Sequence, residues 1–266
     1  MKMERKVYIR AFSRISICHP DPDYSGMFSI MEARRMSRLM KRALAVSKST
    51  LDEAGISVPD AVVTGTGMGC IENTELFLRS LSGMSDAPLR PTHFMQSTHN
   101  TIGSLIAIKL GCHGYNATYS HSSVSFESAL LDAFVQIRLG MLDNALVGAF
   151  EEMTPAFAAI MEKGGCKSLV MPDGSLSETA VSMLLSSSPD DAICELEGVQ
   201  LASADAWDMD CTDFVSRYGG NFCIPALVAC DAAEAIASGQ RDRVVVQNAL
   251  LDKPNANLIL NRICGR

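Results

Sequence analysis

The sequence has few aromatic residues and less positive than negative charge. Aromatic side chains make up 6% of the 266 residues, with a single tryptophan, so the core must come mainly from aliphatic side chains and 15 methionines. The chain carries 23 lysines and arginines against 30 aspartates and glutamates, a net charge of −7. Because such a chain repels polyanions, general nucleic-acid binding is excluded. A hydrophobic fraction of 47% also excludes wholesale disorder.

Signals for export or membrane insertion are missing as well. The first residues pass from charged side chains directly into a β-rich segment, without the apolar stretch of a secretory signal. The longest apolar candidate, residues 223–237, is interrupted by Asp231 and Glu234. The nine cysteines are odd in number and contain no Cys-x-x-Cys pair, so we expect buried free thiols. These features predict a cytoplasmic protein without membrane contact.

Motifs of the common cofactor and metal sites do not occur. Residues 65–69 read Gly-Thr-Gly-Met-Gly after a predicted strand, but a dinucleotide fingerprint needs a glycine where Cys70 stands. Neither a phosphate loop ending in Gly-Lys-Ser/Thr nor a Gly-x-Ser-x-Gly motif is found. Four of the five histidines fall within 29 residues, without the ligand spacing of a zinc site. We therefore expect a structural glycine turn, no metal and no cofactor.

Strand-like and helix-like segments alternate along the chain. The predicted strands are residues 7–17, 61–65, 116–120, 144–150, 180–186, 194–202, 244–248 and 258–261. The predicted helices are residues 29–54, 72–81, 96–110, 122–139 and 225–238, while residues 205–220 have no clear periodicity. This alternation predicts an α/β fold with parallel strand pairing. Since no Pro/Gly/Ser-rich linker divides the chain, residues 1–266 are expected to form one domain.

Several short blocks occur in a characteristic order. Residues 91–103 read Pro-Thr-His-Phe-Met-Gln-Ser-Thr-His-Asn-Thr-Ile-Gly, residues 116–123 read Asn-Ala-Thr-Tyr-Ser-His-Ser-Ser, and residues 143–152 read Asp-Asn-Ala-Leu-Val-Gly-Ala-Phe-Glu-Glu. The glycine turn at 65–69 and Asn-Ala-Asn-Leu-Ile-Leu at 255–260 complete the order. In this order the sequence resembles the β-ketoacyl synthases of the thiolase-like superfamily. The resemblance implies a layered α/β/α fold with a complete N-terminal half, residues 1–190, and a strongly shortened C-terminal half, residues 191–266.

The resemblance places the catalytic groups of the family on altered residues. His121, followed by Ser122, stands where the family has its nucleophilic cysteine. One family histidine would fall within residues 199–214, which contain none, and the other aligns with Asn221. A condensing enzyme must hold its acyl group as a stable thioester, whereas an acyl-imidazole hydrolyses readily. Condensation by this chain alone is therefore not expected.

A non-condensing role follows from the same resemblance. Chain length factors lack the cysteine, pair with an active ketosynthase and shape the pocket in which the chain grows. The resemblance thus implies a partner subunit in fatty-acid or polyketide synthesis of the aryl-polyene type. It places Phe94, Met95, Ser120 and Ser123 beside the acyl chain, with Ser122 and His121 at the reaction centre.

Two other hypotheses fit the same residues. A serine among residues 120–123 with His121 as base would give an acyl-thioester hydrolase or an acyltransferase, although adjacent residues rarely form such a pair. A metal- or ligand-binding module is the third hypothesis. A covalent acyl adduct on a serine distinguishes the second hypothesis from a purely structural role.

A basic stripe lies on the first predicted helix. Its members are Arg34, Arg35, Arg38, Lys41 and Arg42. The stripe has two interpretations, a solvated helix face or a docking surface for an acidic acyl carrier protein. The resemblance further implies a homodimer or heterodimer formed through residues 116–120 and 94–103. The expected partners are therefore an acyl carrier protein and an active ketosynthase.

Overall fold

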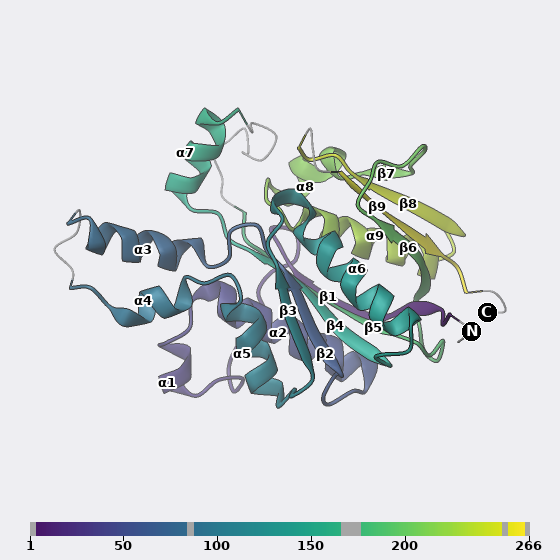
Figure 1. Ribbon diagram of the computed structural model, residues 1–266, viewed down its shortest axis with the longest axis horizontal. Coiled ribbons are helices and arrows are strands. Elements are labelled where there is room, and N and C mark those ends of the chain that lie inside the picture. Colours follow the sequence, from purple (N-terminus) through teal and green to yellow (C-terminus); the bar gives the residue numbers. More distant parts are fainter. Residues whose placement is uncertain (1–3, 84–87, 166–176, 252–254, 264–266) are drawn as a thin grey trace.

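The computed structural model describes residues 4–83, 88–165, 177–251 and 255–263, and joins their strands in one nine-stranded sheet (Figure 1). The strands are β1 (Val7–Ile15), β2 (Ala61–Gly65), β3 (Tyr115–Tyr119), β4 (Asn144–Glu151), β5 (Thr179–Ser186), β6 (Cys194–Gln200), β7 (Met209–Asp210), β8 (Arg243–Asn248) and β9 (Ala256–Asn261). Their order in the sheet is β3-β2-β4-β5-β1-β6-β9-β8-β7. All eight predicted strands are present, and β7 is an addition at one edge.

Helices connect and cover the strands. The α-helices are α1 (Ile30–Ala33), α2 (Arg38–Ala54), α3 (Ile71–Leu81), α4 (Pro91–Gln96), α5 (Thr101–Leu110), α6 (Ser125–Arg138), α7 (Pro155–Lys163), α8 (Val215–Tyr218) and α9 (Ile224–Ala237). Two 3₁₀ turns, η1 (Ser122–Val124) and η3 (Cys211–Phe214), precede α6 and α8. The predicted helix over residues 225–238 is α9 to within one residue at each end.

The sheet is mixed, so the predicted parallel pairing holds for only part of it. Strand β2 pairs in parallel with β3 and β4, and β7 pairs in parallel with β8. The centre is antiparallel, since β5 lies between β4 and β1, and β6 and β9 continue the antiparallel pattern. The strands at the centre are buried on both faces and therefore read as continuous apolar runs, which gives no signal of strand direction.

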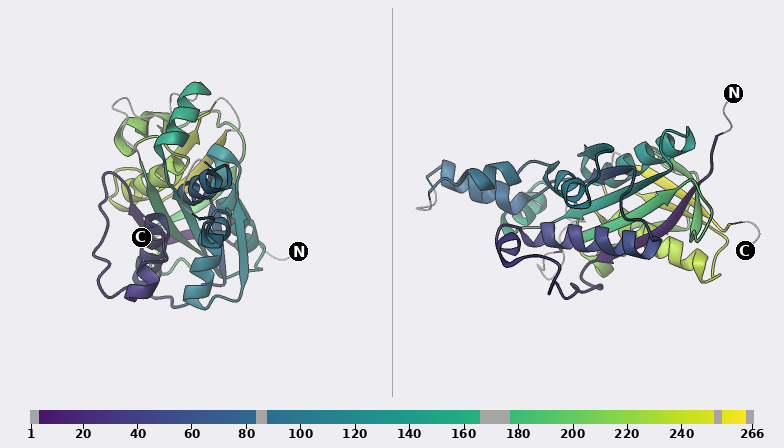
Figure 2. Two further views of the ribbon diagram at one scale, coloured as in Figure 1. Left: turned by 90° about the vertical axis from the view of Figure 1, so that its left-hand side faces the viewer. Right: turned by 90° about the horizontal axis from the view of Figure 1, so that it is seen from below.

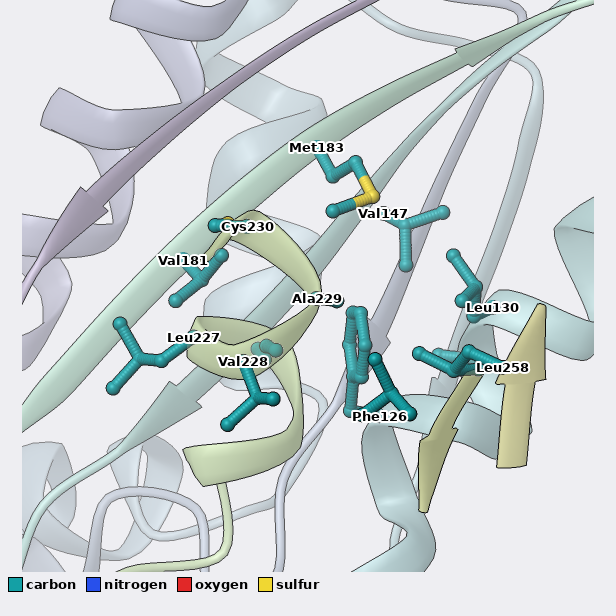
Figure 3. Packing of buried hydrophobic residues seen from close by; sticks show 14 of the residues in the cluster. Phe126, Leu130, Val147, Val181, Met183, Leu227, Val228, Ala229, Cys230 and Leu258 are labelled. Carbon is teal, nitrogen blue, oxygen red and sulfur yellow. The ribbon is translucent and has the colours of Figure 1, made fainter. Parts of the chain in front are cut away.

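Helices pack on both faces of the β1–β5 part of the sheet, with α6 and α9 on one face and α2 and α5 on the other, as the fold class predicts. Successive residues of one strand face opposite layers, because side chains alternate along a strand. In β2, Val63 packs in the cluster formed with α6 and α9, whereas Val62 packs in the cluster formed with α2 and α5. Figure 3 displays the first cluster, in which Phe126 and Leu130 of α6 lie near residues of α9 and the strands. The result is the layered α/β/α architecture of a thiolase-like domain.

Three predicted helices are divided or shortened. The long helix expected over residues 29–54 breaks at Ser37, whose Oγ accepts the N–H of Met40 at 3.2 Å and caps α2. Gly55 ends α2 as expected, with a φ of 66°. The helix expected over residues 96–110 begins at Thr101, after the separate helix α4. The helix expected from residue 122 opens as the 3₁₀ turn η1.

Helices α3 and α4 form an arm that extends away from the sheet (Figures 1 and 2). Their contact includes the rings of Phe77 and Phe94, with centroids 5.2 Å apart. Only Ile71 and Asn73 of α3 are buried, and no residue of α4 is. In the single chain, the arm therefore exposes apolar side chains to solvent, among them Leu78 and Met95.

No described helix is both long and apolar enough to cross a lipid bilayer.

Seven cysteines lie in the described part of the chain and all are free thiols. Six of them are buried, and only Cys18 is exposed. Cys166 and Cys264 lie outside the described residues.

Candidate functional site

The residues predicted for the reaction centre lie where β3 ends and the turn η1 leads into α6. The N–H of Thr66 donates to the carbonyl of Tyr119 at 3.0 Å, which holds the end of β3 against the loop after β2. Ser120 then donates its hydroxyl proton to the carbonyl of Gly67 at 3.3 Å. Parallel strands bring their carboxyl ends to one edge, where sites in α/β folds commonly form. We call residues 120–124 the helix tip.

The glycine turn at residues 65–69 is structural, as predicted. A Cβ on Gly65 would overlap the backbone carbonyl of Ser125, and one on Gly67 would overlap the ring of Phe222. Both carboxylate oxygens of Glu151 accept backbone N–H groups of this turn, from Gly67 at 2.6 Å and Met68 at 3.0 Å. Burial raises the pKa of Glu151 to about 8, although these hydrogen bonds favour the charged form. The turn therefore serves close packing and leaves no cradle for a phosphate.

His121 is exposed, yet two serines of α6 fix its position. Its backbone N–H donates to Ser125 Oγ at 2.9 Å, and its Nδ1 lies 2.9 Å from Ser128 Oγ. Each hydroxyl in turn donates to a carbonyl of η1: Ser125 to Ser122 at 2.7 Å and Ser128 to Val124 at 2.8 Å. A hydroxyl has one proton, so assigning it to the Val124 carbonyl makes Ser128 Oγ the acceptor of Nδ1–H. In neutral His121, Nε2 then carries the lone pair.

The serines of the helix tip have different environments. Ser122 is exposed and has a φ of 54°, a left-handed conformation that is uncommon for residues other than glycine. Ser123 is fully buried, and its hydroxyl has no hydrogen-bond partner among the described residues. The ring of His121 bonds Ser128, its backbone N–H bonds Ser125 and its carbonyl accepts the N–H of Val124, and no hydrogen bond joins the ring to the hydroxyls of residues 120–123 within the described chain.

Asn221 lies in the buried loop between α8 and α9. Its Nδ2 donates to Ser177 Oγ at 2.7 Å and Thr179 Oγ1 at 2.9 Å, and its Oδ1 accepts the N–H of Cys223 at 2.7 Å. The next residue, Phe222, packs against Gly67, which the helix tip also contacts. The structure thus brings the loop of Asn221 close to the helix tip, with the Asn221 amide hydrogen-bonded at both ends.

A buried carboxyl beneath the helix tip was missed by the sequence analysis. Glu127 of α6 is 1% exposed, and its Oε1 accepts Asn248 Nδ2 at 2.6 Å. Asn248 also donates to the carbonyl of Ser123 at 2.8 Å, linking the end of β8 to the tip. Burial raises the pKa of Glu127 to about 7. A glutamate in the first turn of a helix is ordinarily exposed to solvent and interacts favourably with the helix dipole. The sequence therefore gives no signal that Glu127 is buried.

Phe94 and Met95 lie on α4, in the arm. Their exposed fractions are 57% and 70%, and Phe94 contacts Phe77 of α3. No recorded contact joins them to the helix tip within the described part of this chain. They are therefore surface residues of the single chain, in the same segment that was predicted to form the dimer.

The basic stripe divides into two groups. Arg42 is 6% exposed and pairs with Asp21 and Glu178 at 2.5 and 2.8 Å. Arg38 contacts the same two carboxylates beside a cavity of about 480 Å³. Arg42 holds the pKa of Asp21 below its ordinary range through hydrogen bonds. Arg34 and Arg35 are exposed and Lys41 is half-buried, with no salt bridge recorded for these three described residues.

The described residues contain no group of three or more His, Cys, Asp or Glu side chains that could hold a metal ion. Thiol chemistry is disfavoured at the buried cysteines. Burial raises the pKa of Cys211 and of Cys223 well above the ordinary value, and that of Cys194 to about 12. These groups remain protonated and are poor nucleophiles near neutral pH.

The layered sheet, with a helix tip at the end of a parallel strand, defines a thiolase-like domain. The chain belongs to the β-ketoacyl synthase family: the family description "Beta-ketoacyl synthase, N-terminal domain" matches residues 16–212. This confirms the resemblance carried by the glycine turn and the blocks at residues 91–152. No curated protein matches the chain in sequence.

Solved structures with the same fold are distant in sequence. An acyl-carrier protein–ketosynthase complex of a type II PKS, AntDE:AntF, aligns at 13% identity with a TM-score of 0.80, over 97% of this chain and 100% of the other. The ishigamide ketosynthase/chain length factor aligns at 17% identity with a TM-score of 0.72, over 97% of this chain and 99% of the other. The ketosynthase ApeO with its chain length factor ApeC, from Xenorhabdus doucetiae, aligns at 17% identity with a TM-score of 0.63, over 97% of this chain and 99% of the other.

Proposed function

We propose that this chain is a non-condensing subunit that pairs with an active ketosynthase in fatty-acid or polyketide synthesis of the aryl-polyene type. The observation that carries the proposal is the imidazole of His121 at the helix tip, the position that the resemblance assigns to the family's cysteine. Condensation needs an acyl enzyme that is stable until the second substrate arrives. An imidazole does not supply one, because an acyl-imidazole hydrolyses readily.

The surroundings of the helix tip support a role without condensation. The Asn221 amide, which the resemblance aligns with a catalytic histidine, bonds Ser177, Thr179 and the backbone of Cys223, as a structural residue does. The buried thiols of Cys211 and Cys223 stay protonated. No described group near the tip thus offers a thiolate.

The open edge of the sheet supports pairing with another subunit. Strand β3 is the terminal strand and pairs with β2 alone within the described sheet. An exposed edge strand is a ready template for another chain, and native proteins usually cover it. The exposed apolar side chains of Phe94 and Met95 lie on the neighbouring arm. Two of the similar structures are named as a ketosynthase with a chain length factor, which agrees with a partner of that kind.

The first test replaces His121 with cysteine. We expect His121→Cys to give a thiol at the exposed tip that reacts with iodoacetamide, yet no condensation above the wild-type background, because Asn221 replaces a needed histidine. Co-purification with an active ketosynthase, and elongation of an acyl-carrier substrate with malonyl-carrier, are the measurements. Elongation by the purified wild-type chain alone, at the rate of an active ketosynthase, contradicts the proposal.

Carrier docking is the second part of the proposal. Arg34 and Arg35, between α1 and α2, and Lys41, in the first turn of α2, offer positive charge, whereas Arg42 is committed to the buried ion pairs. Exposed ion pairs contribute roughly 0.2–1 kcal/mol each, so the double variant Arg34→Glu/Arg35→Glu should weaken binding of an acyl carrier protein by up to about 30-fold. Titration at low and high salt measures this effect.

The matched control for docking is Lys48→Glu, an exposed charge on the far part of α2 that pairs with Asp52. We expect it to leave carrier binding unchanged. Equal binding by the double variant and the wild type would assign the stripe to a solvated helix face instead.

A further inference from the structure

His121 is held more tightly than a residue that fills a disused site requires. The backbone N–H and the Nδ1–H of His121 each donate to a serine hydroxyl of α6. Each of these two hydroxyls donates its own proton to a backbone carbonyl of η1. The edge of its ring faces Tyr119, with centroids 5.9 Å apart and planes at 72°. The side chain nevertheless remains exposed. The ring is thus fixed in position and presents Nε2 with no partner among the described residues.

A fixed tautomer gives Nε2 a defined chemical capacity. A base that is oriented by a third group, here Ser128, is the arrangement found in hydrolytic sites. The base is not directed at a serine of the tip, since no hydrogen bond among the described residues joins the ring to Ser122, while Ser120 donates to the carbonyl of Gly67 and Ser123 is buried. The proton acceptor at Nε2 is therefore available to water.

We propose that His121 is a general base that hydrolyses acyl thioesters, so that the subunit removes stalled or wrong acyl groups from the carrier. The choice of thioester as substrate class rests on the proposed function. Nε2 takes a proton from a water molecule as the water oxygen bonds to the carbonyl carbon of the thioester. The C–S bond then breaks, the thiolate leaves with the electron pair, and the imidazolium returns the proton to it. The products are a carboxylic acid and a free thiol.

Ser128 has a positioning role in this step. Its Oγ keeps the Nδ1 proton in place while Nε2 gains and loses a proton. Because the imidazolium also donates from Nδ1, the same hydrogen bond persists in the charged state. No group other than water and the thioester is needed for the balance of atoms and charge.

The test uses the full-length chain and octanoyl-N-acetylcysteamine as the thioester, with the acid product quantified by mass spectrometry. We expect His121→Gln to lower the rate by about 100-fold or to the rate in buffer, the lower end of the effect of a positioned base. The matched control is His113→Gln, another exposed histidine, which should retain the wild-type rate. A slower wild-type rate in D₂O supports proton transfer from water.

A second pair of variants separates positioning from folding. Ser128→Ala should lower kcat with little change in KM, because the substrate still binds while the ring is no longer oriented. Ser80→Ala is its control, since Ser80 makes the same hydroxyl contact to the carbonyl four residues earlier, in α3. Equal melting temperatures of Ser128→Ala and wild type exclude unfolding as the cause.

Three results overturn the proposal. They are a wild-type rate no higher than that of buffer, an unchanged rate in His121→Gln, and an acyl adduct on Ser120, Ser122 or Ser123. None of them decides whether the chain pairs with a ketosynthase, because pairing is measured separately by co-purification. Conversely, hydrolysis by a chain that binds no ketosynthase would contradict the proposed function and leave the hydrolytic role in place.

Discussion

Raising the pH from about 5 to about 9 is expected to destabilise the folded chain, mainly through Glu127 and Glu151. Both carboxyls are buried, and burial raises their pKa from 4.5 to about 7 and about 8. In the unfolded chain they ionise near their ordinary pKa. The native state therefore holds more protons than the unfolded state across this window.

The sign of the effect follows from this difference in bound protons. A group with a raised native pKa contributes its full stability below pH 4.5, and the contribution is lost as the pH rises through the native value. Each pKa unit corresponds to about 1.4 kcal/mol, so Glu127 alone accounts for a loss on the order of 3 kcal/mol. The pKa of His19, lowered by burial, acts in the opposite direction, because it adds stability as the pH rises through the lowered native value toward 6.5.

Neighbouring acidic groups reinforce the trend, whereas neighbouring hydrogen-bond donors oppose it. Glu151 lies near Glu152, whose own pKa is raised to about 7 by burial. Glu151 also accepts hydrogen bonds from the backbone N–H groups of the glycine turn. Glu127 faces Asn248 and the buried thiols of Cys211 and Cys223, which remain neutral at the same pH. No recorded salt bridge to a cation neutralises the charge of Glu127 or Glu151 among the described residues, so ionisation leaves a buried negative charge.

Thermal melting across this pH range measures the effect, with Glu127→Gln as the decisive variant. Gln resembles the protonated acid in shape and keeps the acceptor for Asn248, but it does not titrate. We expect equal melting temperatures near pH 5, and a variant that melts about 6 °C or more above wild type near pH 9. Glu53→Gln, an exposed glutamate on α2, should retain the wild-type slope. A flat profile for the wild type would refute the burial argument.

The sequence predicted the elements better than their directions. Segments such as β2 and α9 have apolar patterns bounded by glycine or proline, and their predicted limits agree with the structure to within one residue. Strand direction is decided by which strands become neighbours, and β5 lies between β4 and β1, which are far away in sequence. Local sequence patterns do not indicate which strands become neighbours in the sheet. The antiparallel pairing at its centre was therefore not predicted.

The resemblance implied that His121 and Asn221 lie in one region, but it gave no signal of their hydrogen-bond partners. Aligned blocks placed His121 and Asn221 in one region, and contacts through Gly67 bring the two loops together. The partners of His121, however, are Ser125 and Ser128, which face it only because η1 turns before α6 begins. Likewise, Arg42 follows the helical pattern of an exposed stripe, and its burial depends on carboxylates at residues 21 and 178. Such long-range pairing is invisible in a single sequence.

Gly65→Ala is expected to lower the free energy of unfolding by about 3 kcal/mol, the upper range for forced overpacking. The new methyl group would overlap the carbonyl carbon and oxygen of Ser125 and the N of Phe126. These are backbone atoms in the first turn of α6, which cannot rotate away as a side chain can. Strand β2 and α6 must separate, and the buried contacts of Phe126 and Leu130 are strained with them.

Gly198→Ala is the matched control for this substitution. Gly198 also lies in a strand, but a Cβ there would meet only Ile259 Cδ1, at 3.8 Å, an ordinary contact. The control should therefore melt at or above the wild-type temperature, whereas Gly65→Ala should melt about 6–12 °C lower. Equal melting of the two variants would mean that β2 and α6 are not in direct backbone contact.

The same substitution tests whether the helix tip depends on that contact. Ser125 receives the N–H of His121 and bonds the carbonyl of Ser122, so displacing its backbone moves the imidazole. At a temperature where Gly65→Ala is still folded, we expect thioester hydrolysis to fall toward the rate of His121→Gln, while Gly198→Ala retains the wild-type rate. Lower stability with an unchanged hydrolysis rate would separate the packing of α6 from the chemistry of His121. Loss of both in parallel would assign to Gly65 the task of holding the helix tip in its working position.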